Sequence, residues 1–255
     1  MIEIKELYKK FDGHQVLDGV SLKINTGETT VIIGRSGCGK SVLLKHIIGL
    51  LKPDYGCIMI DGKDVTRMDE KELNAMRMQF GMLFQGAALF DSLDIMDNVG
   101  FNMIEHTGSD RETVRKRVKE CLELVGLKGI EHKKPAELSG GMRKRVGLAR
   151  AIALRPQIVL YDEQTTGVDP IMGDSINDLI IELHNKLKVT SIAVTHDMTS
   201  AYKIADRIAM LYNGKIIAQG SPEEIRSAAD PIVRQFITGA SKGPITEGID
   251  FKHLI

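Results

Sequence analysis

The stretch GRSGCGKS, from Gly34 to Ser41, combines glycines, a lysine and a hydroxyl side chain in a spacing that suits phosphate binding. It follows the β-branched run TTVII and precedes the apolar segment SVLLKHIIGLL, so the pattern G-x-x-x-x-G-K-S/T has the strand-to-helix context that it requires. Glycines allow successive backbone N–H groups to point inward, and the helix N-terminus adds partial positive charge. Lys40 is expected to neutralise β- and γ-phosphate oxygens, and Ser41 to offer its hydroxyl to Mg²⁺. The residues expected to contact the nucleotide are Gly34, Arg35, Ser36, Gly37, Cys38, Gly39, Lys40, Ser41 and Val42.

A pair of carboxylates, Asp162 and Glu163, ends a second apolar run, IVLYDE. In open α/β sheets, ligands bind outside the carboxyl ends of the strands. A magnesium ion and an attacking water both need oxygen groups close to the phosphates. We therefore expect Asp162 to hold the hydrated Mg²⁺ and Glu163 to orient or deprotonate the water. The structural alternative is a pair of solvated acids at a strand end.

A second anion-binding helix start is expected in ELSGGMRKRVGLARAIALRPQ, residues 137–157. Ser139, Gly140 and Gly141 immediately precede a segment in which apolar residues recur at helical spacing. A GTPase switch would need the guanine-reading pattern N-K-x-D, which the sequence lacks, and a small-molecule kinase would need an arginine-bearing lid. Two phosphate-binding helix starts in one chain therefore need another explanation.

These groups must be positioned by a mixed α/β core. Short β-branched apolar runs at 29–34, 157–163, 189–196 and 207–220 alternate with segments of helical period. Continuous apolar strands separated by helices predict a parallel sheet covered on both faces. Alternating segments near the N-terminus, such as GCIMIDGKDV at 56–65, favour antiparallel hairpins. The fold class is therefore α/β with a β-rich N-terminal flank.

A helical insert is expected at about residues 86–155. Within it, the segment from Asp110 to about Leu127 has an apolar stripe at helical spacing, formed by Val114, Val118, Cys121, Leu122 and Val125. We expect one domain over residues 1–239 and a C-terminal tail over 240–255. The tail has no clear period and is expected to be loosely ordered. Its apolar residues near the end are Ile249, Phe251, Leu254 and Ile255.

The composition excludes several classes of protein. The 255 residues include 34 Lys and Arg and 34 Asp and Glu, so no global charge attracts the chain to nucleic acid or anionic lipid. The 3 cysteines are widely spaced and match neither a metal-ligand pattern nor a disulfide framework, so reduced cytosolic thiols are expected. We find no secretory leader and no run near the roughly 18 apolar residues that a membrane-spanning helix needs.

The order of these motifs resembles that of the ATP-binding cassette (ABC) ATPases. L-S-G-G before a helix, closely followed by an Asp-Glu strand end, resembles the signature motif of that family, and the resemblance extends from Ile2 to about Gly239. Phe11 matches the position at which the family stacks an aromatic ring on adenine. Gln85 matches the loop glutamine that touches Mg²⁺ and the water, and His196 matches the histidine that senses the γ-phosphate. The loop GVDP, with Gly167 and Asp169, resembles the loop that meets the opposing subunit.

This resemblance implies a P-loop NTPase core of ABC type that hydrolyses ATP with Mg²⁺. It also implies a homodimer in which two chains enclose two ATP molecules. Ser139, Gly140 and Gly141 of one chain then close over the ATP of the other, which accounts for the two phosphate-binding helix starts. The implied catalytic residues are Lys40, Glu163 and His196, and the implied metal contacts are Ser41, Gln85 and Asp162.

Two positions depart from the usual family pattern. Gln164 stands where proline usually follows the Asp-Glu pair, which makes the backbone turn beyond the pair harder to predict. Met142 stands in place of the commoner glutamine after L-S-G-G. The signature helix with Met142, the segment Phe84–His106 and the segment Asp230–Ile245 resemble the ATPase subunit of the Mla/MCE-type phospholipid transporters.

The latter resemblance implies a multispanning permease and a periplasmic MCE lipid-binding protein as partners. The chain would then act as a peripheral protein at the cytoplasmic face of the inner membrane. In the superfamily, the segment after the loop glutamine docks an intracellular helix of the permease. Here that segment carries Ala87, Ala88, Leu89 and Phe90 in succession, which we expect to form an exposed apolar patch unless it packs internally.

Two other functions remain open. One is a soluble cassette ATPase acting on nucleic acid, for which Arg143, Lys144 and Arg145 are the candidate phosphate contacts. Charges at the start of an exposed helix are usually solvated, and such proteins usually carry coiled-coil insertions or two fused cassettes, so no nucleic-acid partner is expected. The other is an importer of amino acids or metals, which would share the mechanism and differ in cargo.

Overall fold

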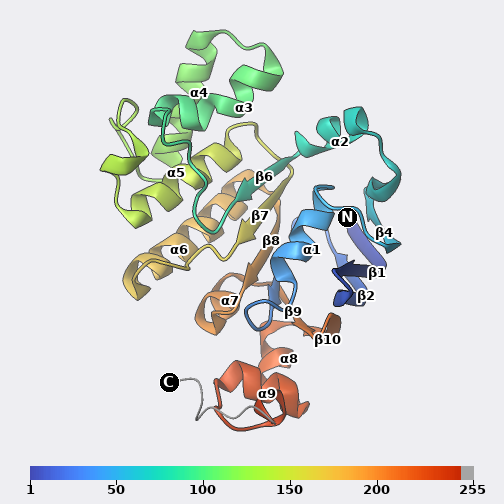
Figure 1. Ribbon diagram of the computed structural model, residues 1–255. Helices are drawn as coiled ribbons and strands as arrows, with labels where there is room; N and C mark the ends of the chain where they lie inside the picture. Colours follow the sequence, from blue (N-terminus) through green and yellow to red (C-terminus); the bar gives the residue numbers. More distant parts are fainter. Residues whose placement is uncertain (248–255) are drawn as a thin grey trace.

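The computed structural model describes residues 1–247 and contains two β-sheets (Figure 1). The smaller, antiparallel sheet has the strand order β2-β1-β4-β5. Its strands are β1 (Ile2–Phe11), β2 (His14–Ile24), β4 (Tyr55–Ile60) and β5 (Lys63–Asp64). The larger sheet has the order β10-β9-β3-β8-β7-β6. Its strands are β3 (Thr29–Ile33), β6 (Phe80–Leu83), β7 (Ile158–Asp162), β8 (Thr190–Thr195), β9 (Arg207–Tyr212) and β10 (Lys215–Gly220).

The larger sheet is parallel except for the β9–β10 hairpin. Every residue of β3, β7 and β8 is buried, which explains why these strands are nearly continuous apolar runs. Alternate residues of β3 belong to different cores: Val31 and Ile33 pack on one face of the sheet, and Ile32 packs on the other with the antiparallel sheet. The predicted mixed α/β fold with a β-rich N-terminal flank is confirmed.

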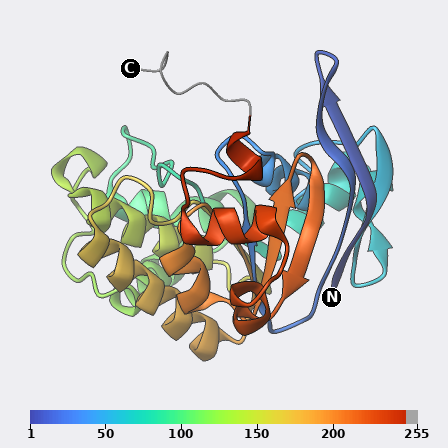
Figure 2. The ribbon, with the colours of Figure 1, turned by 90° about the horizontal axis from the view of Figure 1, so that it is seen from below.

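The helices cover both faces of the parallel sheet and form a separate group at one end of it (Figures 1 and 2). That group contains α3, α4 and α5, which contact one another. The α-helices are α1 (Lys40–Ile47), α2 (Glu70–Arg77), α3 (Ile95–Thr107), α4 (Arg111–Leu124), α5 (Gly140–Ile152), α6 (Pro170–Leu187), α7 (Met198–Ile204), α8 (Pro222–Arg226) and α9 (Pro231–Thr238). Single 3₁₀ turns lie at Val65–Arg67, Pro135–Glu137 and Pro244–Thr246. Within residues 1–247, no helix is both long enough and apolar enough to cross a membrane.

Helix α4 confirms the predicted amphipathic segment. Asp110 caps its N-terminus by accepting a hydrogen bond from the Thr113 N–H. The predicted stripe, Val114, Val118, Cys121, Leu122 and Val125, is buried against α3 and α5. All three helices lie inside the range 86–155 that the sequence predicts for the insert, and the limits of that insert remain a prediction.

The C-terminal segment differs from its prediction. Residues 240–247 are not loosely ordered, because Gln235 on α9 fastens them: its amide donates to the Ala240 carbonyl and its Oε1 accepts from the Ile245 N–H at 2.7 Å. Ile245 is only 9% exposed and joins the larger core. The buried side chain of Ile245 and the hydrogen bonds of the Gln235 amide are therefore enough to hold residues 240–247, although their sequence has no helical or strand periodicity. The predicted apolar end, Ile249, Phe251, Leu254 and Ile255, lies outside the described residues.

The expected apolar patch after Gln85 is only partly exposed. Ala87 is buried and Leu89 packs partly against the larger core, so these two do not face solvent. Ala88 and Phe90 are exposed. Phe90 lies against Phe101 on α3, with ring centroids 4.8 Å apart. The prediction of a continuous exposed patch was therefore wrong for Ala87 and Leu89, which pack inside the protein.

The buried thiol of Cys121 gives a test of this packing. Burial raises the pKa of Cys121 to about 11, so the reactive thiolate is scarce at mildly alkaline pH. We expect native protein to resist iodoacetamide at Cys121 and to react there only as it unfolds, as measured by time-resolved mass spectrometry. Cys57, which is partly exposed on β4, serves as the control. Equal labelling rates at Cys57 and Cys121 in native protein would contradict this packing.

Candidate nucleotide-binding and hydrolysis site

The phosphate loop joins the buried strand β3 to helix α1. Gly34 has φ +155°, and a Cβ there would lie 2.4 Å from the Leu211 carbonyl oxygen on β9, so the close approach of the two backbones requires glycine. Gly39 has φ +103° and precedes the first residue of α1, where no side chain caps the helix. The helix start is therefore open to an anion, as the sequence predicts.

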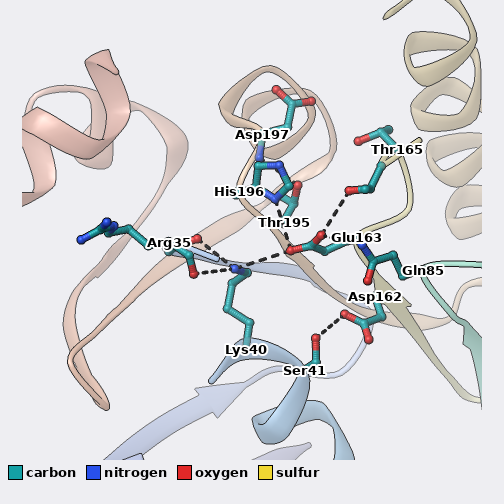
Figure 3. Close-up of polar contacts among 12 residues, drawn as sticks. Arg35, Lys40, Ser41, Gln85, Asp162, Glu163, Thr165, Thr195, His196 and Asp197 are labelled. Carbon is teal, nitrogen blue, oxygen red and sulfur yellow. Dashed lines mark hydrogen bonds and ion pairs between the residues drawn. The ribbon is translucent and has the colours of Figure 1, made fainter. Parts of the chain in front are cut away.

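Lys40 is the first residue of α1, and its buried side chain reaches back to the phosphate loop. Its ammonium group donates to the carbonyl oxygens of Gly34, at 2.9 Å, and Arg35, at 3.0 Å, and lies 3.7 Å from Glu163 Oε1 (Figure 3). The amine is thus held between the phosphate loop and the end of β7. A cation fixed in this position can neutralise phosphate oxygens with little loss of side-chain entropy.

The residues expected to contact the metal have the chemistry for Mg²⁺. Ser41 Oγ donates to Asp162 Oδ1 at 2.7 Å, so a hydroxyl and a carboxylate from α1 and β7 already meet (Figure 3). Both are hard oxygen donors, and Gln85 adds an amide oxygen on the neighbouring loop. Residues 1–247 contain no cluster of three or more His, Cys, Asp or Glu that would form a metal cage. This donor set suits an ion that takes its remaining ligands from water and substrate phosphates.

Glu163 follows β7 directly and has φ +47°, a left-handed conformation that is rare for glutamate. His196 Nδ1 lies 3.2 Å from its Oε1, while Thr166 Oγ1, at 3.2 Å, and Gln85 Nε2, at 3.3 Å, donate to its Oε2. Burial raises the pKa of Glu163, but the hydrogen bond and charge of His196, the charge of Lys40 and the Thr166 hydroxyl outweigh it, and the net pKa is lowered. The carboxylate is therefore ionised at neutral pH.

Gln164, the unusual residue after the pair, has a side chain with no exposed surface, and its amide oxygen and nitrogen have no hydrogen-bond partner within the described part of the chain. The backbone beyond it still turns tightly, because the Thr166 N–H donates to the Glu163 carbonyl at 3.1 Å. Both carboxylates therefore keep their positions without proline.

The signature residues form a second cluster. Ser139 caps α5 by accepting from the Met142 N–H, and a Cβ at Gly140 would lie 3.9 Å from the Gly167 carbonyl oxygen. The signature helix start thus adjoins the loop of Gly167 and Asp169, where Asp169 caps α6. Among residues 1–247, no hydrogen bond or ion pair connects Ser139–Gly141 with the phosphate loop. One chain therefore brings together Lys40, Ser41, Gln85, Asp162, Glu163 and His196 and leaves the signature apart.

Phe11 ends β1 at the tip of the β1–β2 hairpin and is 39% exposed. The Lys9 ammonium lies 5.5 Å from the centroid of its ring. The hairpin continues beside the phosphate loop, because a Cβ at Gly39 would lie 3.0 Å from Val16 on β2. An exposed aromatic ring at this place agrees with a base-stacking role, which remains a prediction.

The basic cluster at 143–145 agrees only in part with its interpretation as a solvated helix start, because Arg143 is exposed and Lys144 is buried. Lys144 is buried, Arg143 donates to the Leu138 carbonyl, and Arg145 donates to the Val125 carbonyl and to Ser175 Oγ. Sequence reasoning also missed Thr166, whose hydroxyl holds Glu163. No local sequence pattern marks these residues, because their partners, backbone carbonyls and the side chains of Glu163 and Ser175, are set by the tertiary fold.

The fold and the site together define an ATP-binding cassette. The ABC transporter family model matches residues 17–166. The chain is 42% identical over 245 residues to the intermembrane phospholipid transport system ATP-binding protein MlaF of Haemophilus influenzae, covering 96% of this chain and 93% of that protein. It is 44% identical over 244 residues to the probable ribonucleotide transport ATP-binding protein mkl of Mycobacterium leprae, covering 96% of this chain and 70% of that protein.

Solved structures of cassettes agree with this match. The dimeric structure of MJ0796, a bacterial ABC transporter cassette, has a TM-score of 0.81 at 33% identity and covers 87% of this chain and 99% of that chain. A dimeric post-hydrolysis state of the same cassette, bound to ADP and Pi, has a TM-score of 0.80. The chain belongs to the ABC transporter family and is an ABC-type ATPase. Within the family it is MlaF-like.

The hydroxyl of Thr166 gives a test of the electrostatics at Glu163. Because this hydroxyl donates to the carboxylate and stabilises its ionised form, Thr166→Val should raise the pKa of Glu163. The acidic limb of the kcat/KM profile, which reports the free enzyme, should then move to higher pH. Thr165→Val is the matched control, since Thr165 Oγ1 lies near Ser200 instead, at 3.4 Å. Coincident acidic limbs for wild type and Thr166→Val would contradict the assignment.

Proposed function

We propose that Glu163 is the general base of ATP hydrolysis and that Lys40 and His196 complete the catalytic group. The observation that carries this proposal is the ionised Glu163 carboxylate, held between Lys40 of the phosphate loop and His196 at the end of β8. A base must lie close to the phosphates and be deprotonated at working pH, and both conditions fit this side chain.

Each residue then has a defined task. Lys40 exchanges carbonyl contacts for β- and γ-phosphate oxygens, and the backbone N–H groups from Gly34 to Val42 surround the phosphates. Ser41, Asp162 and Gln85 would hold Mg²⁺, which neutralises phosphate charge when bound. Glu163 accepts the proton of the attacking water, and His196 orients Glu163 and faces the γ-phosphate. Phe11 stacks on the adenine ring.

We further propose that the working unit is a homodimer with two shared sites. Ser139, Gly140 and Gly141 of one chain would supply donors to the γ-phosphate held by its partner, and Gly167 and Asp169 would meet the opposing subunit. The separation of the signature cluster from the phosphate loop within one chain supports this arrangement. The dimeric structures of the related cassette support it as well. Hydrolysis would remove the bridging phosphate and part the halves.

We propose that this ATPase drives phospholipid transport as a peripheral subunit at the cytoplasmic face of the inner membrane. Its partners would be a multispanning permease and a periplasmic MCE lipid-binding protein. The name and high coverage of the MlaF relatives support this cargo. The mkl relatives carry a different cargo in their name, ribonucleotide, so cargo must be tested directly.

An exposed apolar strip on the helical group is suited to the permease. It consists of Phe90, which lies against Phe101, and Ile104, one turn further along α3 and 44% exposed. On the same helix, Asn102 and His106 line a cavity of about 370 Å³ that α2 also borders. Exposed apolar side chains on a helix are suited to packing against a partner helix.

A nucleic-acid function has less support. Of its candidate contacts, Lys144 is buried and Arg145 donates to the Val125 carbonyl and to Ser175, so only Arg143 is exposed to meet a phosphate backbone. The formal charge of zero gives no attraction to compensate. A small-molecule importer shares the proposed mechanism and differs only in the cargo that its permease selects.

The catalytic assignment is tested by Glu163→Gln. Because the amide keeps the shape but cannot accept the proton, we expect ATP binding to persist, turnover to fall by two orders of magnitude or more, and a nucleotide-bound dimer to accumulate. Size-exclusion chromatography with MgATP and a phosphate-release assay give the two measurements. Glu120→Gln, the same change at a carboxylate on α4 that pairs with Arg117, is the control. Wild-type turnover in Glu163→Gln would place the base elsewhere.

The membrane role is tested by Ile104→Asp. A charge in the apolar strip should reduce the permease and phospholipid recovered with the tagged ATPase from gently solubilised membranes, while ATPase activity of the free protein stays near wild type. Tyr55→Asp, a change at a residue 76% exposed on the antiparallel sheet, is the matched control. Unchanged recovery of permease with Ile104→Asp would exclude this docking surface, and bound ribonucleotide in place of phospholipid would change the cargo.

A further inference from the structure

Helix α5 carries two buried cations, Lys144 and Arg150, which are 5% and 9% exposed. Neither forms an ion pair with a carboxylate in the part of the chain that the structure describes. Burial lowers the pKa of both groups. A buried charge without an ion-pair partner is costly unless it is hydrogen-bonded, so both side chains depend on their hydrogen-bond partners.

The partners of Lys144 are backbone carbonyl groups on either side of the site. Its ammonium donates to the carbonyl of Gln85 and to that of Glu163, the latter at 3.4 Å. The side chains of Gln85 and Glu163 are also hydrogen-bonded to each other, at 3.3 Å. Lys144 therefore ties together the backbones of two residues whose side chains already meet at the site.

The hydrogen bond from Lys144 to Glu163 reaches a strained part of the backbone. Its backbone lies in the left-handed region, with φ +47°, which costs free energy for a residue with a Cβ. Its carbonyl accepts from the Thr166 N–H as well as from Lys144, and its N–H donates to the Val194 carbonyl at 2.9 Å. These bonds hold the strained backbone and so fix the direction of the carboxylate.

Arg150, six residues further along α5, acts on the adjacent part of the Gln85 loop. Its guanidinium donates to the carbonyls of Ala87 and Ala88, both at 2.6 Å. Ala87 and Ala88 have φ +61° and +47°, so this turn is also strained. Helix α5 thus holds the loop at two places, and only the Lys144 contact extends to the end of β7.

We propose that Lys144 is a positioning residue for ATP hydrolysis, which joins the carbonyls of Gln85 and Glu163 to the helix that begins at Ser139. The inference rests on the proposed roles of Gln85 and Glu163. It adds that the signature helix and the base of the same chain move as one unit. A nucleotide that pulls on the start of α5 in the dimer then also sets the Glu163 carboxylate of that chain.

The direct test is Lys144→Met, which keeps the length and volume of the side chain and removes its donors. We expect kcat to fall about tenfold or more, because small displacements of catalytic groups have effects of this size, while KM for ATP changes less than about twofold. Lys144→Gln, which retains a donor for a carbonyl, should recover much of the lost rate.

Arg117→Met is the matched control. Arg117 on α4 is another partly buried cation that donates to carbonyls of the α5 region, those of Ile152 and Ala153, away from the site. A purely structural role would make Lys144→Met and Arg117→Met alike: both would lower the melting temperature and neither would lower kcat selectively. Wild-type kcat in Lys144→Met, or an equal fall in both variants, would overturn the proposal.

A double-mutant cycle tests whether Lys144 acts through Gln85. If it does, Gln85→Ala combined with Lys144→Met should be little slower than the slower single variant, whereas independent effects would multiply. Multiplicative effects would overturn the proposal. Should Lys144→Met fail to fold, the same cycle is run with Lys144→Leu, which also lacks donors, and multiplicative effects there have the same meaning. Glu163→Gln distinguishes failure of this proposal from failure of the proposed function. Normal turnover in Glu163→Gln would show that Glu163 is not the base, and the kcat of the Lys144 variants would then test the role of Lys144 by itself.

Discussion

The ionised carboxylate of Glu163 is the group on which the geometry of the site depends. It lies where the carboxyl ends of β3, β7 and β8 meet, because these strands are parallel and in a register that pairs Asp162 with Val194 and Ile33 with Thr195. Lys40 follows the first strand and His196 the third, so both reach the same carboxylate. The parallel sheet thus places Lys40 and Glu163, which are more than a hundred positions apart in the sequence, at the same edge of the sheet.

The residues of the phosphate loop and of the end of β7 could be predicted because they belong to local sequence patterns. The glycines and Lys40 belong to one continuous pattern, and Asp162 and Glu163 end an apolar strand, so type and position suffice. The α4 stripe was predictable for the same reason, since it depends only on helical spacing. His196 and Gln85 required resemblance to a family, because single polar residues in loops have no pattern of their own.

Other features depend on tertiary packing that no local pattern records. Lys144 stands in a run of three basic residues that resembles a solvated helix start, yet it is buried and bonded to carbonyl groups. Every residue has a carbonyl, so a partner of this kind leaves no trace in the sequence. Ile245 was likewise unpredictable, because its docking depends on one amide, that of Gln235, ten residues earlier. Ala87 is buried by the fold around it, although its neighbours Ala88 and Phe90 are exposed.

The same geometry supports the proposal that one chain is an incomplete enzyme. Helix α5 begins next to the Gly167 loop and packs on α6, where a Cβ at Gly141 would lie 2.6 Å from Met172. This contact places the start of α5, with Ser139, Gly140 and Gly141, against α6. Within residues 1–247, no hydrogen bond or ion pair connects these three residues with the phosphate loop. In the proposed homodimer a second copy would supply the missing donors, and the exposed apolar surface on α3 would remain for the permease.

Mixing two inactive variants tests this central claim most directly. Lys40→Met removes the cation that would neutralise the phosphates, and Ser139→Phe blocks the signature, so each homodimer should be inactive. A mixed dimer contains one site with an intact phosphate loop from one chain and an intact signature from the other. We expect the mixture to regain part of the wild-type ATPase activity. If each chain completed its own site, the mixture would stay as inactive as its components, and the shared-site account would be contradicted.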